Sequence, residues 1–241
     1  MSRALFISDL HLSAGRPDTN QQFFRFLAGE APRARALYIL GDLFEYWIGD
    51  DALEQDALGL EVVRSLKRLA DAGVQISLMH GNRDFLIGAR FCAAAGAALL
   101  DDPRVVEIDG EPTLLMHGDT LCTDDVDYQA WRRNARSEAW QREFLARPSA
   151  ARHAEIGALR EKSKAVVQAK PADIMDVADA AVRAAFRAHG VARLIHGHTH
   201  RAARHALEVD GRRCERWVLP DWYGRGGYLA LADGAPMLVS F

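Results

Sequence analysis

The sequence predicts a domain of the α/β (α+β) class, in which two β-sheets pack face to face and helices cover their outer faces. Three observations predict it: apolar runs alternate with helical patterns in the first hundred residues, hairpin patterns dominate after residue 103, and a helical stretch near residues 125–170 interrupts the strands. A length of 241 residues suits one domain, residues 1–241, that carries this insertion.

Short apolar runs that end abruptly in polar residues are predicted as buried strands. They span residues 4–8, 36–40, 74–79, 113–116 and 193–195. Hairpin strands around Asp-Gly turns, and strands at the C-terminal end, are expected at 105–108, 205–209, 214–219, 228–231 and 237–241.

Helices are expected between the early strands at residues 20–31 and 57–72, so the N-terminal half has a βαβαβ pattern. Residues 125–170 are rich in Ala, Arg, Glu and Gln, with a break at 147–149 where Ser149 is a suitable N-cap. This pattern predicts a helical hairpin inserted between two strands whose ends both carry polar candidate ligands.

Composition and charge narrow the possible functions. The net charge of −3 lacks the basic excess that nucleic-acid binding normally requires. Three widely spaced cysteines favour a reducing compartment over a disulfide framework, and we interpret Cys122 as a buried small residue rather than a nucleophile. Because no apolar run reaches the roughly 18 residues of a membrane span, we expect any membrane contact to be peripheral.

Three histidines at alternate positions follow the strand at 193–195: His196, His198 and His200. Three imidazoles held together are costly unless a metal ion or a charge compensates them, so this cluster favours a metal site over an ordinary core. On an extended backbone His198 and His200 share one face, as do Asp9 and His11 after the first strand. Each pair is therefore expected to converge on one ion.

Further oxygen and nitrogen donors follow other strand ends, each beside a glycine: Asp42, Asn82 and His117. Each of them alone is more typical of a turn. A donor set without thiolates suits Mn²⁺, Fe²⁺ or Zn²⁺. Seven donors are too many for one tetrahedral ion, whereas two ions about 3.5 to 4 Å apart, bridged by Asp42, would use them all.

Taken in order, Asp9-x-His11, Gly41-Asp42, Gly81-Asn82, His117 and Gly197-His198-x-His200 resemble the motifs of the calcineurin-like metallophosphoesterases. The resemblance implies a four-layer αββα sandwich with two Mn²⁺ ions at the strand ends. It assigns one ion to Asp9, His11, Asp42 and His200, and the other to Asp42, Asn82, His117 and His198.

Arg83 stands where many members of that family have a histidine that acts as an acid near the leaving group. A substrate whose leaving group needs little protonation, such as a pyrophosphate, would suit this site, and Arg83 could neutralise its charge.

Residues 43–51, 81–88 and 117–125 are similar to one group of that family, the pyrophosphatases that cleave UDP-2,3-diacylglucosamine in lipid A biosynthesis. The similarity implies that a water activated by two metal ions attacks the α-phosphorus and yields UMP and 2,3-diacylglucosamine 1-phosphate. It also implies that the helical insertion caps the site and takes up the acyl chains. The expected location is the cytoplasmic face of the bacterial inner membrane, with peripheral attachment and no obligate protein partner.

Two sets of site residues carry over from this similarity. The catalytic set is the seven metal ligands and Arg83. The substrate-binding set is Asn82, Arg83, Asp125, Ser163, Val167, Lys170 and His198. Val167 is apolar at a place where a polar residue is expected.

Alternatives remain open at this stage. The chain could be a general phosphodiesterase or phosphatase of the same fold, or a binding scaffold, although scaffolds of this fold have lost metal ligands that are all present here. The aromatic residues of the insertion, Trp131, Trp140 and Phe144, could line an acyl-chain groove or pack the helices onto the body. Its arginines could contact anionic head groups or form an ordinary solvated face.

Overall fold

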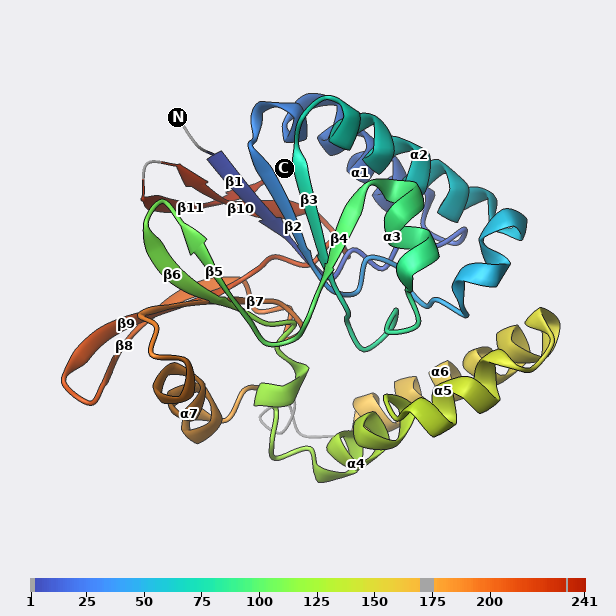
Figure 1. The fold of residues 1–241 in the computed structure, drawn as a ribbon. Coiled ribbons are helices and arrows are strands. Elements are labelled where there is room, and N and C mark those ends of the chain that lie inside the picture. Colours follow the sequence, from blue (N-terminus) through green and yellow to red (C-terminus); the bar gives the residue numbers. More distant parts are fainter. Residues whose placement is uncertain (1–2, 170–175, 233) are drawn as a thin grey trace.

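Two β-sheets lie face to face at the centre of the protein, as a computed structural model shows (Figure 1). The structure describes residues 3–169, 176–232 and 234–241, without the side chains of residues 161–169. The six-stranded sheet has the order β11-β10-β1-β2-β3-β4, in which β1 to β4 pair in parallel. Its strands are β1 (Arg3–Ile7), β2 (Ala36–Leu40), β3 (Gln75–Met79), β4 (Ala97–Leu100), β10 (Gly227–Ala232) and β11 (Ala235–Ser240).

The five-stranded sheet has the order β5-β6-β7-β9-β8, and its central strands β6, β7 and β9 are parallel. Its strands are β5 (Arg104–Ile108), β6 (Glu111–Leu115), β7 (Arg193–His196), β8 (Ala203–Val209) and β9 (Arg212–Val218). The predicted strands are confirmed, with bounds that differ by one or two residues. Strand β4 was not predicted, because its Ala-Ala-Leu-Leu sequence contains no β-branched or aromatic residue.

Helices form the two outer layers (Figure 1). The outer face of the six-stranded sheet is covered by α1 (Pro17–Gly29), α2 (Ala57–Asp71) and α3 (Ala89–Ala95), and the five-stranded sheet by α7 (Asp179–His189). Short 3-10 turns are η1 (Ala31–Arg33), η2 (Asp50–Gln55) and η3 (Asp119–Leu121). The four-layer αββα class is thereby confirmed, while α3 and α7 were not predicted.

The alternation of side chains along β1 shows how the layers are joined. Leu5 and Ile7 belong to the core between the six-stranded sheet and its helices, whereas Ala4 and Phe6 belong to the core between the two sheets. Successive strand residues point to opposite faces, so a strand that is apolar throughout fills both cores.

The insertion between η3 and α7 contains three described helices: α4 (Val126–Ala135), α5 (Glu138–Leu145) and α6 (Ser149–Ala169). The expected hairpin of two helices is therefore wrong. The reason is Ser137, whose hydroxyl caps α5 by accepting a hydrogen bond from the Trp140 amide at 3.3 Å. The break at 147–149 was placed correctly. Within the described segments, no helix combines the length and hydrophobicity needed to cross a bilayer.

Candidate metal centre

The seven predicted ligands lie together in loops that follow the carboxyl ends of β1, β2, β3, β6 and β7. These ends meet because β1 to β3 are parallel in one sheet and β6 and β7 are parallel in the other. Five loops far apart in sequence therefore supply side chains to one place. Polar residues that follow parallel strands are brought to one edge of a sheet by topology alone.

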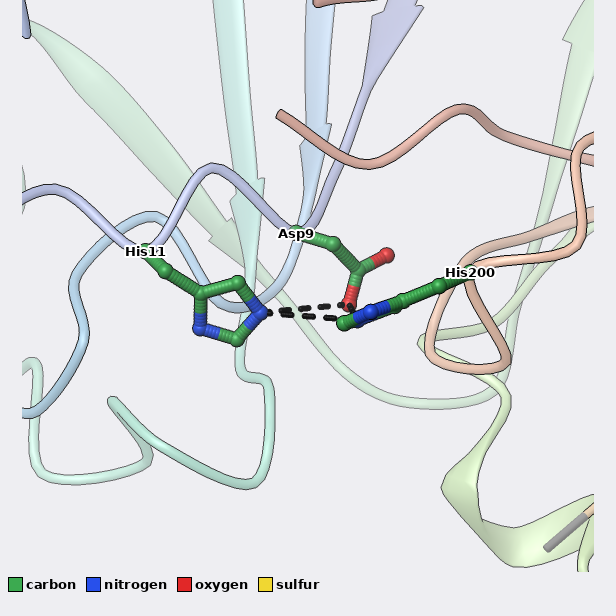
Figure 2. A group of neighbouring side chains, drawn as sticks. All are labelled: Asp9, His11 and His200. Carbon is green, nitrogen blue, oxygen red and sulfur yellow. Dashed lines mark hydrogen bonds and ion pairs between the residues drawn. The ribbon is translucent and has the colours of Figure 1, made fainter. Parts of the chain in front are cut away.

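The first group of donors contains Asp9, His11, Asp42 and His200. Figure 2 shows the imidazoles of His11 and His200 directed toward each other beside the Asp9 carboxylate. Their Nε2 atoms are 3.5 Å apart, and His200 Nε2 is 3.3 Å from Asp9 Oδ1. His11 Nε2 is also 3.8 Å from Asp42 Oδ2. Four donors thus converge on one small volume.

The second group contains Asp42, Asn82, His117 and His198. Asn82 Oδ1 is 3.1 Å from His117 Nε2 and 3.0 Å from His198 Nδ1. Asp42 joins the two groups, since its Oδ1 is 3.9 Å from His117 Nε2 while its Oδ2 faces His11. A carboxylate with one oxygen toward each group has the position required of a bridge.

The backbone at these ligands differs from the sequence-based expectation. Asp9, His11, Asp42, His198 and His200 have φ values of 55°, 52°, 53°, 67° and 55°, in the left-handed region. The assumption of an extended backbone for the two pairs is therefore wrong, because β1 ends at Ile7 and β7 ends at His196. Such conformations are uncommon for residues other than glycine and persist where surrounding structure enforces them.

Two glycines allow the ligand loops to approach one another closely. A Cβ atom on Gly81 would lie 2.0 Å from Asp42 Oδ1, and one on Gly197 would lie 2.2 Å from Asp9 Oδ2. No side chain fits at either position. The glycines beside the candidate ligands therefore let one loop's backbone touch another loop's carboxylate.

Asp84 is a buried carboxylate to which the sequence analysis gave no role. It accepts hydrogen bonds from the amides of Leu43 at 2.8 Å and Gly81 at 2.9 Å, and so ties the loop after β2 to the loop after β3. The signal available in the sequence was an acidic residue directly before the apolar run Phe85-Leu86-Ile87. An unpaired buried carboxylate is costly, so a charge in that setting indicates a structural partner.

Burial and neighbouring charges shift the ionisation of the ligands in opposite directions. Burial raises the pKa of Asp42 to about 7, although the charge on His117 opposes this. Burial would lower the pKa of His117, but the charges on Asp42, Asp119 and Asp9 together outweigh it and raise the pKa to about 9. Burial and the charge on His117 lower the pKa of His198 to about 4. His198 is therefore neutral, as a metal ligand must be, whereas His117 holds a proton that a bound cation would have to displace.

The donor set fits divalent metal ions. Ligand atoms of Asp9, His11 and His200 lie within 4.8 Å of one another, as do those of Asp9, Asp42 and His117. Asp9 Oδ1 and His11 Nδ1 are buried without a hydrogen-bond partner in the described part of the chain. Buried polar atoms are normally satisfied, so an orphan carboxylate oxygen within a group of imidazoles fits a coordinated cation.

The predicted substrate contacts are placed unevenly. Arg83 is half-buried next to Asn82, and its amide donates to Asp42 Oδ1 at 2.8 Å. Asp125 caps α4 by accepting from the Tyr128 amide at 3.1 Å. Lys170 and the side chains of Ser163 and Val167 lie outside the described residues. His196 is buried, and its Nε2 lies 3.0 Å from Nη1 of Arg216. Cys122 is buried, as predicted.

The insertion reaches the centre through Tyr128 of α4, whose ring stacks on His198 with the ring centres 6.0 Å apart. The Tyr128 hydroxyl donates to the buried Asp119 carboxylate at 2.5 Å. Farther out, Trp140 stacks on the buried Phe144, while Trp131 is 36% exposed. The aromatic residues of the insertion therefore serve both packing and an exposed apolar surface.

The sequence pattern of the calcineurin-like phosphoesterase family matches residues 2–202. The chain belongs to this family and is a metal-dependent hydrolase.

Curated relatives cover nearly the whole chain. A UDP-2,3-diacylglucosamine hydrolase of Aromatoleum aromaticum is 52% identical, with 99% of this chain and 97% of the relative covered. Proteins with the same name from Nitrosococcus oceani and Pseudomonas aeruginosa UCBPP-PA14 are 53% and 51% identical. The alignment with the Nitrosococcus protein covers 90% of this chain and 86% of the relative. The alignment with the Pseudomonas protein covers 94% of each.

Proposed function

We propose that this protein hydrolyses the pyrophosphate of UDP-2,3-diacylglucosamine, giving UMP and 2,3-diacylglucosamine 1-phosphate, a step of lipid A biosynthesis. The observation that carries the proposal is the convergence of seven donors in two groups that share Asp42. Relatives of that name at about half identity over nearly the full chain support the choice of substrate.

The proposed metal ligands follow the two groups. Asp9, His11, Asp42 and His200 would hold one Mn²⁺, and Asp42, Asn82, His117 and His198 the other. When bound, the ions lower the pKa of a water molecule and stabilise charge that develops on the phosphate. The protein's part is to fix the donors through loops whose backbone is held by buried carboxylates, Asp84 among them.

Arg83 lies beside the centre. It would bind the phosphate group of the leaving product, 2,3-diacylglucosamine 1-phosphate, as its bond to the α-phosphorus breaks. Its positive charge already acts on the centre, where it opposes the burial that raises the pKa of Asp42 and adds to the burial that lowers the pKa of His11. A guanidinium offers fixed donors to phosphate oxygens and stays charged at any physiological pH. Such a group stabilises a leaving phosphate without transferring a proton.

Contacts to the substrate are proposed for Asn82, Arg83, Asp125, Ser163, Val167, Lys170 and His198. The acyl chains would lie along the insertion, where Trp131, Leu145 and Val126 are large apolar residues exposed by 36%, 39% and 67%. Exposed apolar side chains on these helices also suit peripheral contact with the cytoplasmic face of the inner membrane.

The test supplies purified protein with Mn²⁺ and UDP-2,3-diacylglucosamine and follows UMP release. Wild-type protein should release UMP, and His11→Ala and Asn82→Ala should lose most of this activity because each lacks a metal donor. His189→Ala, an exposed histidine on α7, is the matched control and should stay active. No UMP from the wild type, or equal UMP from all variants, would sink the proposal.

Oxygen-18 water identifies the phosphorus that is attacked. Attack at the α-phosphorus puts the label in UMP. Label in the lipid phosphate instead would mean attack at the other phosphorus, and turnover of simple aryl phosphates at a comparable rate would favour a general phosphodiesterase.

A further inference from the structure

Glu45 is a buried carboxylate beside the metal centre for which the proposed reaction has no use. It follows β2 in the same loop as Asp42, and it is 7% exposed. One of its oxygens pairs with the guanidinium of Arg160 on α6, and the other lies 3.6 Å from Nδ1 of His11. A buried carboxylate is costly without partners, so these two contacts account for its position.

The imidazole of His11 has a defined orientation toward the centre. Its Nε2 faces the donor group, 3.5 Å from His200 Nε2 and 3.8 Å from Asp42 Oδ2. A nitrogen that binds a metal must be unprotonated, so in that state Nδ1 carries the hydrogen. In the described part of the chain Nδ1 is buried without a hydrogen-bond partner, and the Glu45 carboxylate is the acceptor beside it. Histidine ligands commonly donate their second N–H to a carboxylate, which fixes the ring.

The chain that continues from Glu45 to Asp51 also contacts α6. Arg152 on α6 is buried and pairs with Asp51, with Nη1 2.8 Å from Oδ1. Farther along α6, the guanidinium of Arg160 pairs with Glu45 and also lies 5.4 Å from the ring centre of Tyr46. Glu45 therefore stands between the insertion and the ligand His11, with one oxygen for each.

We propose that Glu45 is a positioning residue that receives the Nδ1–H of His11 and the guanidinium of Arg160 together, so that seating of α6 and metal binding at His11 stabilise each other. This inference rests on the metal centre of the proposed function. Coupling of this kind is reciprocal: the metal ion should hold α6 in place as much as α6 favours the metal ion.

Metal affinity provides the first test, by equilibrium dialysis of the full chain against Mn²⁺ without substrate. Glu45→Gln should weaken one of the two Mn²⁺ equivalents roughly tenfold to a hundredfold, because the carboxylate that orients His11 loses its charge. Glu54→Gln is the matched control, since Glu54 has an 82% exposed side chain that pairs with Arg90 at 3.6 Å. Unchanged binding of both ions by a folded Glu45→Gln protein would overturn the proposal.

Chymotrypsin digestion tests the coupling, because the insertion offers aromatic cleavage sites such as Trp131 and Trp140. Mn²⁺ should slow cleavage of the insertion in the wild type and in Arg142→Gln, which changes an exposed arginine of α5. It should give little or no protection in Glu45→Gln and Arg160→Gln. Equal protection by Mn²⁺ in all four proteins would overturn the link between α6 and the metal site.

These two experiments separate the inference from the proposed function. Arg160 is only partly buried, so Arg160→Gln carries the test even if Glu45→Gln fails to fold. Neither assay contains substrate. A protein that releases no UMP, yet shows the expected differences in Mn²⁺ affinity and protection, would disprove the substrate and keep the role of Glu45. Wild-type protein that binds no Mn²⁺ would overturn both.

Discussion

The ligand loops and the helical insertion meet at the metal centre, but different interactions hold them. Main-chain amides bind buried carboxylates in the loops, as Leu43 and Gly81 bind Asp84, and the His198 amide binds Asp9 at 2.8 Å. The insertion is attached through side chains, by Arg132, Arg152 and Arg160 paired with acidic residues of the body. The centre is therefore specified by backbone geometry, and the insertion by side chains, through ion pairs at separate points and through Ala135 and Phe144 in the hydrophobic core.

The largest effect on activity expected from this contrast is at Gly81, where both metal binding and turnover should be lost. Alanine there would place a carbon 2.0 Å from Asp42 Oδ1, against a loop backbone that cannot move without breaking its bonds to Asp84. We expect Gly81→Ala to lose Mn²⁺ binding and to reduce kcat/KM by at least about a hundredfold, about 2.7 kcal/mol or more of transition-state stabilisation.

Gly157 of α6 is the matched control, because nothing lies within 4 Å of a Cβ atom at that position. Gly157→Ala should keep its activity and gain up to about 1 kcal/mol of stability from helix propensity. Urea unfolding and UMP release measure both variants. Equal losses in the two proteins would show that the insertion is as intolerant as the loops.

The second effect concerns the anchor of α4. The Asp119 carboxylate is fully buried and accepts a hydrogen bond from Arg132 Nε at 2.6 Å, in addition to its bond from Tyr128. Asp119→Asn would leave the guanidinium without its main counter-charge. We expect the free energy of unfolding to fall by about 3–5 kcal/mol.

Urea unfolding measures this loss. The control is Asp127→Asn, which changes an exposed carboxylate of α4 and should change stability by less than about 0.5 kcal/mol. A loss as small as that of the control would mean that α4 is held by packing rather than by the ion pair.

The contrast between the regions also explains what the sequence could and could not predict. The seven candidate ligands could be predicted to lie together because donors follow buried strands, and parallel strands bring their ends together whatever the loops do. The left-handed backbone at Asp9 and His198 was not predicted, because it arises from contacts between loops that are distant in sequence. Asp84, Glu45 and Asp119 were missed for the same reason: a carboxylate acquires its role only when another segment folds over it.

The sequence predicted that the insertion is helical, but it did not predict the number of helices. Composition indicated helix throughout, but the start of a separate helix α5 depends on Ser137, a single capping side chain. The aromatic residues of the insertion have two different roles: Phe144 is buried by packing, whereas Trp131 is partly exposed. Their sequence spacing does not show which of them contacts the body, because that depends on how the helices fold onto it.

The smallest effect expected depends on pH and separates two carboxylates that share Arg132. Asp119 lies 2.6 Å from Arg132 Nε, whereas Asp102 lies 3.8 Å from Arg132 Nη2. Burial and then the charge on Asp119 raise the pKa of Asp102 to about 6 from an ordinary value of 3.8. Between about pH 4 and 6 the folded protein therefore holds a proton that the unfolded chain has lost. The stability contributed by this group falls as pH rises through that window.

Asp102→Asn removes that titration, so the variant should gain stability relative to the wild type as pH rises from about 4 to 6. A shift of about two pKa units corresponds to at most about 3 kcal/mol. Urea unfolding at several pH values measures the difference, with Asp101→Asn as the control because its side chain is 90% exposed. A difference that stays constant across this range would mean that Asp102 is ionised throughout. Arg132 would then pair with an ionised Asp102 as well as with Asp119, and α4 would be anchored at two acidic residues instead of one.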